Sequence, residues 1–159
     1  MTLVHDEILG TRLLHWADEG RCAADAAALA RSPALHDAFL ELHGPLGAGK
    51  TTFVRHLLRA LGVAGRIKSP SFAVLEPHRA GDLAIQHFDF YRFDDPHEWV
   101  DAGFRDLFAA PGLKLVEWPE KAGGQLPRPD LRLFIEPHAD ETRSVRLEAL
   151  TPRGLELLG

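Results

Sequence analysis

The sequence predicts an α/β protein built on a P-loop NTPase-like sheet, with flanking helices and added antiparallel strands. Three observations favour this fold: a glycine-rich loop between strand-like and helix-like segments, an alternation of apolar strands with helices, and two hairpin-like strand pairs. The chain has 159 residues, of which 45% are hydrophobic. That content is sufficient for one domain, residues 1–159, with a buried core.

The elements can be assigned in order from apolar spacing and from Gly and Pro stop signals. The expected strands are 10–16, 37–43, 71–77, 83–90, 113–117, 131–136 and 144–149. Helices are expected at 19–31, over the apolar stripe that follows the glycine-rich loop and stops at Gly62, and from Asp95 through Val100. Residues 155–158 are expected to form a short closing turn. Residues 78–82 contain a glycine and are expected to be a five-residue hairpin loop.

Residues 44–51 read Gly-Pro-Leu-Gly-Ala-Gly-Lys-Thr and match the P-loop pattern at every fixed position. Its glycines have no side chain to block a tight loop whose N–H groups surround a polyphosphate. Lys50 is expected to reach the β- and γ-phosphates, and the Thr51 hydroxyl to bind Mg²⁺. The loop precedes a helix N-terminus, whose dipole favours phosphate. The motif therefore predicts that the chain binds a nucleoside triphosphate.

A P-loop supplies one hydroxyl to Mg²⁺, so a carboxylate from a neighbouring strand is expected to complete the site. Glu117 ends the apolar strand 113–117, and Asp89 lies in an aromatic strand. Each carboxylate also has a simpler interpretation that needs no nucleotide site. Glu117 could be an exposed strand-end charge, and Asp89 an N-cap or a salt-bridge partner of Arg92.

Composition narrows the class of protein and the compartment. A net charge of −5 argues against a protein that binds nucleic acid unaided. No apolar run reaches the roughly 20 residues needed to cross a bilayer, and the N-terminus does not resemble a signal peptide. The single cysteine, Cys22, is expected to be a small buried residue and fits a reducing, cytoplasmic location. His87 and Asp89 form one close His–carboxylate pair, but a structural zinc site needs four ligands, so we do not expect zinc.

Four motifs occur in an order and spacing that resemble the bacterial TsaE (YjeE-type) ATPases. They are residues 44–52, Lys68-Ser-Pro-Ser-Phe72, His87-Phe-Asp-Phe-Tyr-Arg92 and Val116-Glu-Trp-Pro-Glu120. The resemblance covers roughly residues 16–146, and residues 1–12 are a candidate N-terminal extension. Members of that family support synthesis of N6-threonylcarbamoyladenosine in tRNA.

The resemblance implies an ATP- and Mg²⁺-dependent ATPase that acts with the TsaD and TsaB proteins and reaches tRNA through that complex. It implies catalytic roles for Lys50, Asp89 and Glu117, and metal ligation by Thr51 and Glu117. The nucleotide-binding residues it implies are Gly44, Gly47, Ala48, Gly49, Lys50, Thr51, Thr52, Ser71, Asp89 and Trp118. Ser71 stands in a switch-like loop where the family commonly has threonine. Trp118 could instead be an anchor packed against Pro119.

Three other functions are considered. A small-molecule or nucleoside kinase could use residues 89–92 to bind a phosphoryl acceptor, although no Arg-rich lid segment is present. A GTPase is disfavoured because the chain contains no asparagine and therefore no Asn-Lys-x-Asp element. A direct RNA-binding face would use Arg55, His56, Arg59, Arg66 and Lys68, charges that equally suit a solvated helix surface.

Overall fold

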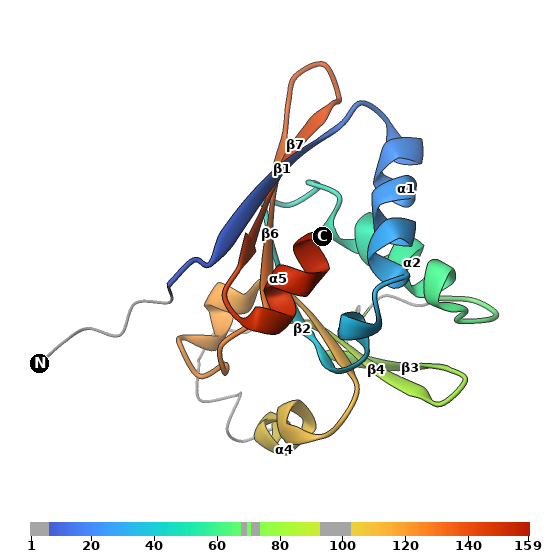
Figure 1. The fold of residues 1–159 in the computed structure, drawn as a ribbon, viewed down its shortest axis with the longest axis vertical. Coiled ribbons are helices and arrows are strands. Elements are labelled where there is room, and N and C mark those ends of the chain that lie inside the picture. The colour runs from blue at the N-terminus through green and yellow to red at the C-terminus, as the bar shows by residue number, and fades with distance from the viewer. Residues whose placement is uncertain (1–6, 68–69, 71–73, 93–102) are drawn as a thin grey trace, which may run out of the picture.

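The computed structural model describes residues 7–67, 70, 74–92 and 103–159. A seven-stranded sheet runs through these residues in the order β1-β7-β6-β2-β5-β4-β3 (Figure 1). The strands are β1 (Gly10–Trp16), β2 (Phe39–His43), β3 (Leu75–Ala80), β4 (Leu83–Asp89), β5 (Leu113–Glu117), β6 (Leu131–Pro137) and β7 (Arg143–Ala149). The helices are α1 (Glu19–Ala30), α2 (Lys50–Leu61), α4 (Phe104–Ala109) and α5 (Pro152–Leu158), with the short 3-10 helices η1 (Pro33–Asp37) and η2 (Pro119–Ala122).

The centre of the sheet is parallel and its two sides are antiparallel. β2 pairs in parallel with β5 and β6, and β4 pairs in parallel with β5. The pairs β1–β7, β6–β7 and β3–β4 are antiparallel. Strand β5, between β2 and β4 in the parallel part of the sheet, is buried along its whole length, as expected where both faces of a parallel sheet are covered. This arrangement confirms the predicted α/β class with added antiparallel strands.

Helices α1, α2 and α5 lie on one side of the sheet in Figure 1. Their apolar faces join the inward side chains of β2, β5 and β6 in the larger core, which includes Leu42, Leu57 and Leu115. In the same core Trp16 stacks on Phe53, with ring centroids 5.6 Å apart. A second, aromatic cluster combines Phe39, Phe88, Phe90, Phe104, Val116 and Ala122. Helix α2 therefore packs into a core that it shares with α1 and the central strands of the sheet.

Several element predictions are confirmed and several need correction. Strands β1 and β5 have the predicted bounds, 10–16 and 113–117. Gly62 ends α2 as predicted, in a left-handed conformation with φ 102°. The predicted five-residue hairpin loop is wrong, because His78 and Arg79 continue β3 by pairing with Ile85 and Ala84 and leave only residues 81–82 to turn.

Other differences occur at element boundaries. Asp37 lies in η1 rather than in a strand, since Pro33 starts a 3-10 turn. The sequence did not predict α4, and the closing turn is the second half of α5. The predicted helix from Asp95 through Val100 lies outside the described residues, as does the start of the strand predicted at 71–77.

Two absences within the described part of the chain bear on function. No helix in it is long and apolar enough to cross a membrane. No group of three or more His, Cys, Asp or Glu side chains in it is arranged to hold a metal ion.

Candidate functional site

The glycine-rich loop leaves the end of β2 and turns into α2, as its position in the sequence predicts. Gly44 has φ 152°, and a Cβ atom there would lie 2.7 Å from the backbone oxygen of Ile135. Gly49, the residue before α2, has φ 109°, in the left-handed region that disfavours side chains. The loop can therefore hold this path only with glycine at both positions, and its path brings the first-turn N–H groups of α2 to the end of the sheet.

Lys50 lies inside the loop rather than in solvent. It is 5% exposed, its Nζ donates a hydrogen bond to the Gly44 carbonyl, and Nζ lies 3.5 Å from the centroid of the Trp118 ring. Burial lowers the pKa of Lys50, and the nearby carboxylates of Glu117, Glu120 and Asp89 oppose that shift. Within the described part of the chain, the ammonium group thus lies near three acids without a direct ion pair to any of them.

Thr51 and Glu117 meet across the site, although they are 66 positions apart in sequence. The Thr51 hydroxyl donates to Glu117 Oε1 at 2.9 Å and lies 3.1 Å from Oε2. The contact follows from strand pairing, since Glu117 is in register with Leu42 of β2, two residues before the loop. Glu117 is buried, so its interpretation as an exposed strand-end charge is wrong.

Asp89 ends β4 in register with Glu117, so the two carboxylates point to the same face of the sheet. Its Oδ1 accepts a hydrogen bond from the Tyr91 N–H at 2.9 Å, a local turn contact. Burial raises the pKa of Asp89, the Glu117 charge raises it further, and the Tyr91 hydrogen bond, His87 and Lys50 lower it. The structure therefore brings Asp89, Glu117, Lys50 and Thr51 to one place.

Trp118 follows β5 in a left-handed conformation, with φ 57°, which is uncommon for a bulky residue. This turn places its indole over Lys50 and 4.9 Å from the Tyr91 ring, centroid to centroid. Strained conformations of this kind cost about 1–3 kcal/mol and concentrate at functional sites.

His87 has a partner that the sequence analysis did not identify. The sequence pairs it with Asp89 without an expected zinc site, and in the structure its Nε2 lies 2.6 Å from Glu117 Oε2. Its position two residues before Asp89 predicted the shared face, but nothing in the sequence indicated Glu117 as its partner.

A small pocket of about 180 Å³ borders the opposite side of the loop. It is lined by Trp16, Asp18, Glu19, Cys22, Gly49, Thr52 and Arg143. Arg143, which the sequence did not single out, donates from Nε to the carbonyl of Ala48, a buried loop residue. Cys22 is buried as predicted, and burial raises the pKa of its thiol to about 12, so the thiol is not reactive at neutral pH.

The remaining candidate positions are placed as follows. Gly47 has φ 80° and nothing within 4 Å of a built Cβ. Ser71 and Lys68 lie outside the described residues. On the proposed RNA-binding face, His56 Nε2 lies 3.0 Å from Glu19 Oε1, and Arg59 donates to the Val63 carbonyl at 3.3 Å. These internal contacts suit an ordinary helix surface.

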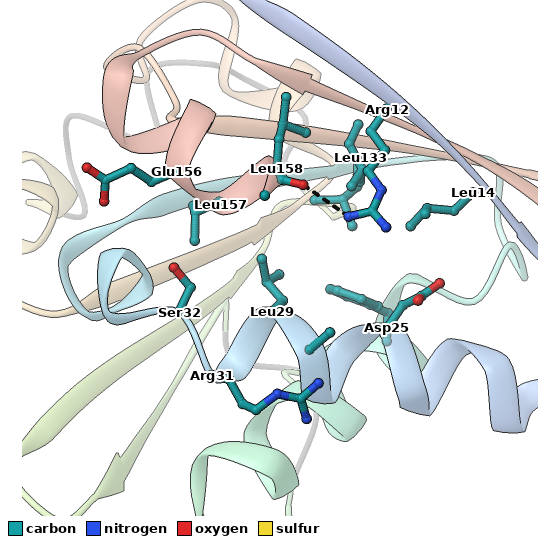
Figure 2. Close-up of a pocket in the computed structure, with 14 residues that line it drawn as sticks. Arg12, Leu14, Asp25, Leu29, Arg31, Ser32, Leu133, Glu156, Leu157 and Leu158 are labelled. Atoms are coloured by element: carbon teal, nitrogen blue, oxygen red, sulfur yellow. Dashed lines mark hydrogen bonds between the residues drawn. The ribbon is translucent and has the colours of Figure 1, made fainter.

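Figure 2 shows another pocket, of about 370 Å³, between β1, α1 and α5. Arg12 reaches across it and donates to the Leu158 carbonyl at 3.0 Å, and Leu29 and Leu133 line its floor. None of residues 44–51 lines this pocket. It is separate from the P-loop site.

The donor set of the P-loop site suits a hard cation with phosphate. A threonine hydroxyl and a carboxylate are oxygen ligands of the kind that Mg²⁺ prefers, and Mg²⁺ keeps several waters beside one or two protein ligands. A lysine and a helix N-terminus beside them favour phosphate oxygens. The site can therefore bind a metal-complexed polyphosphate.

Comparison with known proteins agrees with this geometry. The family model described as threonylcarbamoyl adenosine biosynthesis protein TsaE matches residues 16–145. The chain is similar to the tRNA threonylcarbamoyladenosine biosynthesis protein TsaE of Haemophilus influenzae, with 39% identity over 74% of this chain and 73% of the relative. It is similar to the Bacillus subtilis protein of the same name, with 36% identity over 72% of this chain and 71% of the relative.

Among solved structures, the chain resembles a crystal structure of Bacillus subtilis YdiB, with a TM-score of 0.79 and 27% identity, over 96% of this chain and 94% of that one. The family match spans the P-loop and both acidic strand ends. The chain that holds Lys50, Thr51, Asp89 and Glu117 together in this way belongs to the TsaE family.

Proposed function

We propose that this chain is the Mg²⁺-dependent ATP-binding and ATP-hydrolysing subunit required for N6-threonylcarbamoyladenosine modification of tRNA, acting with TsaD and TsaB in the cytoplasm. Membership of the TsaE family and the names of its relatives support the role in tRNA modification. The contact between the Thr51 hydroxyl and the buried Glu117 carboxylate is the observation that carries the nucleotide-dependent part.

Each side chain has a part in this function. Lys50 leaves the Gly44 carbonyl and the Trp118 ring to pair with the β- and γ-phosphates. Thr51 and Glu117 hold Mg²⁺, which neutralises charge on the phosphate oxygens when it is bound. Asp89, with its raised pKa, lies on the same face and is available to orient the attacking water.

The order of the strands supports one orientation of the bound nucleotide. Glu117 and Asp89 end β5 and β4, on one side of β2, and the Arg143 pocket lies on the other side, toward β7 and β1. We expect the γ-phosphate on the acidic side and the nucleoside at the pocket that contains Thr52, Trp16 and Arg143. At about 180 Å³ this pocket is below the usual size of a whole-ligand site, which fits part of a nucleotide.

The binding test compares Lys50→Ala with Lys121→Ala, a variant of an exposed lysine in η2. Loss of a charge-assisted hydrogen bond costs about 1.5–3 kcal/mol, so we expect Lys50→Ala to weaken Mg-ATP binding by about 10- to 150-fold. Isothermal titration with Mg-ATP measures this, and Lys121→Ala should bind as wild type does. Equal affinity in wild type and Lys50→Ala, with unchanged circular dichroism, contradicts the P-loop assignment.

The biological test measures N6-threonylcarbamoyladenosine in tRNA by mass spectrometry. A bacterial strain depleted of its own TsaE-family protein should regain the modification with the wild-type chain and not with Lys50→Ala. Rapid phosphoryl transfer from ATP to a nucleoside, with no recovery of the modified base, would favour the kinase instead.

A further inference from the structure

His87 occupies the most enclosed position of the site. Its side chain is 1% exposed and that of Glu117 is 3% exposed, and the 2.6 Å contact between them joins neighbouring strands β4 and β5. A buried carboxylate is costly unless hydrogen bonds satisfy its oxygens. Within the described part of the chain, His87 and Thr51 provide the hydrogen bonds to the Glu117 carboxylate.

The two ring nitrogens of His87 lie in different surroundings. Nε2 faces a carboxylate oxygen, which can only accept, so Nε2 carries a proton. Nδ1 is buried and has no hydrogen-bond partner among the described residues. The geometry therefore places a proton on Nε2, directed at Glu117 Oε2.

This hydrogen bond fixes how the Glu117 carboxylate is turned. The terminal torsion of a glutamate is broad and is not fixed by the rotamer alone. His87 contacts Oε2, while Oε1 has no contact with the histidine and lies 2.9 Å from the Thr51 hydroxyl, which is also 3.1 Å from Oε2. Among the described residues, the His87 side chain makes no hydrogen bond to the P-loop or to Lys50. Its effect on the site passes through Glu117.

We propose that His87 is a positioning residue for the metal side of the nucleotide site, whose Nε2–H group holds Glu117 so that Oε1 and the Thr51 hydroxyl form one pair of oxygen ligands. This inference rests on the proposed Mg-ATP binding. Partners that orient metal-ligating carboxylates typically change metal affinity by about 10- to 100-fold when they are removed.

The test compares His87→Leu with His87→Gln. Leucine fills part of the ring's volume without a donor, whereas the glutamine amide can place an N–H near the position of Nε2. Mg²⁺ is titrated into protein saturated with a fluorescent ATP analogue, and the analogue is also titrated without metal. We expect His87→Leu to weaken Mg²⁺ binding by about 10- to 100-fold, with metal-free analogue affinity within about twofold of wild type. His87→Gln should recover most of the loss.

A double-mutant cycle separates positioning from a general packing effect. If His87 acts through Glu117, His87→Leu should not weaken Mg²⁺ binding further when Glu117→Gln is already present. Independent effects on Mg²⁺ binding would instead add. The wild-type titration is read first. A wild type that binds no Mg-ATP overturns the proposed function, while a wild type that binds and a His87→Leu variant that binds Mg²⁺ equally well overturns only the role of His87.

A measurement on the wild-type protein covers the case in which His87→Leu does not fold. Nitrogen-15 NMR distinguishes the two neutral tautomers of an imidazole, and the His87 signals are identified by their loss in His87→Gln. We expect Nε2 to carry a proton. A ring protonated on Nδ1 alone would contradict the proposal, because Glu117 would then have no donor from this ring.

Discussion

At the scale of single residues, the site concentrates ionisable groups where a stable fold would avoid them. Lys50, Glu117 and His87 are all buried, and Asp89 is half-buried beside them. Burial shifts the pKa of Lys50 down and that of Asp89 up, each toward its neutral form. Such shifts are typical of sites selected for chemistry, and they have a measurable effect on stability.

Asp89 gives a signed pH prediction. Its folded pKa lies above the ordinary value of 3.8, so its contribution to stability is present below that value and is lost as pH rises through the higher folded pKa. Asparagine does not ionise and can still accept from Tyr91. We therefore expect Asp89→Asn to be more stable than wild type at pH 7, with the difference shrinking toward pH 4, in urea unfolding followed by circular dichroism.

Asp140→Asn is the control of opposite sign. Hydrogen bonds from the Thr142 hydroxyl and N–H lower the pKa of Asp140, so its ionised form favours the folded state. This variant should be less stable than wild type at pH 7. An Asp89→Asn protein that is less stable than wild type at pH 7 would show that burial does not dominate at Asp89.

At the scale of elements, one buried carboxylate joins the last helix to the strand of the P-loop. Asp130, 7% exposed, accepts from the Phe39 N–H of β2 through Oδ2 at 2.8 Å. Its Oδ1 accepts from the Thr151 hydroxyl at 2.6 Å, and that hydroxyl in turn accepts from the Gly154 N–H as the N-cap of α5. The position of β2, and hence of the loop that follows it, depends in part on α5.

Thr151→Ala should remove both contacts at once. Losing an N-cap costs about 0.5–2 kcal/mol, and the Asp130 oxygen left without a partner adds about 1–3 kcal/mol. We expect a total loss of about 1.5–5 kcal/mol in the free energy of unfolding, measured by urea titration. Thr11→Ala, at an exposed site in β1, is the control and should change it by less than about 0.5 kcal/mol. Equal stability of the two variants would show that α5 is not coupled to β2 in this way.

At the scale of the whole molecule, the order of the strands separates the expected position of the γ-phosphate from that of the nucleoside. The acidic ends of β4 and β5 lie on one side of the P-loop, and the pocket bordered by Arg143 lies on the other. In the proposed function Lys50, Thr51 and Glu117 bind phosphate and metal, and Asp89 and Ser71 are the residues proposed to orient water. A site that lacks one organising group can lose on the order of 10³-fold in rate.

We therefore predict that the isolated chain hydrolyses ATP slowly and that TsaD and TsaB accelerate it, because a partner can order the group that positions water. Steady-state phosphate release is measured with the chain alone, with both partners, and then with tRNA added. The control is Lys50→Ala with both partners, which excludes a contaminating ATPase. Fast turnover by the chain alone, unchanged by the partners, would show that the site is complete without them.

The sequence by itself determined the local features that depend on neighbours in the chain. Residues 44–51 carry the loop glycines, the lysine and the threonine in one contiguous motif. The strands 10–16 and 113–117 and the stop at Gly62 were predictable because apolar spacing and glycine conformation are local properties. Glu117 and Asp89 could be selected as strand-end acids, since parallel strands end at a common edge.

The tertiary structure decided which distant residues meet. His87 and Glu117 are 30 positions apart, and Arg143 contacts Ala48 across 95 positions. These pairs depend on strand order and register, which bring β4, β5 and β7 around the P-loop and which no local pattern contains. The length of the hairpin loop was misjudged for the same reason, because pairing with β4 extends β3 through residues 78–80 and leaves only residues 81–82 as the turn. Local chemistry thus specified the phosphate loop, and long-range strand pairing specified the acids and the histidine that surround it.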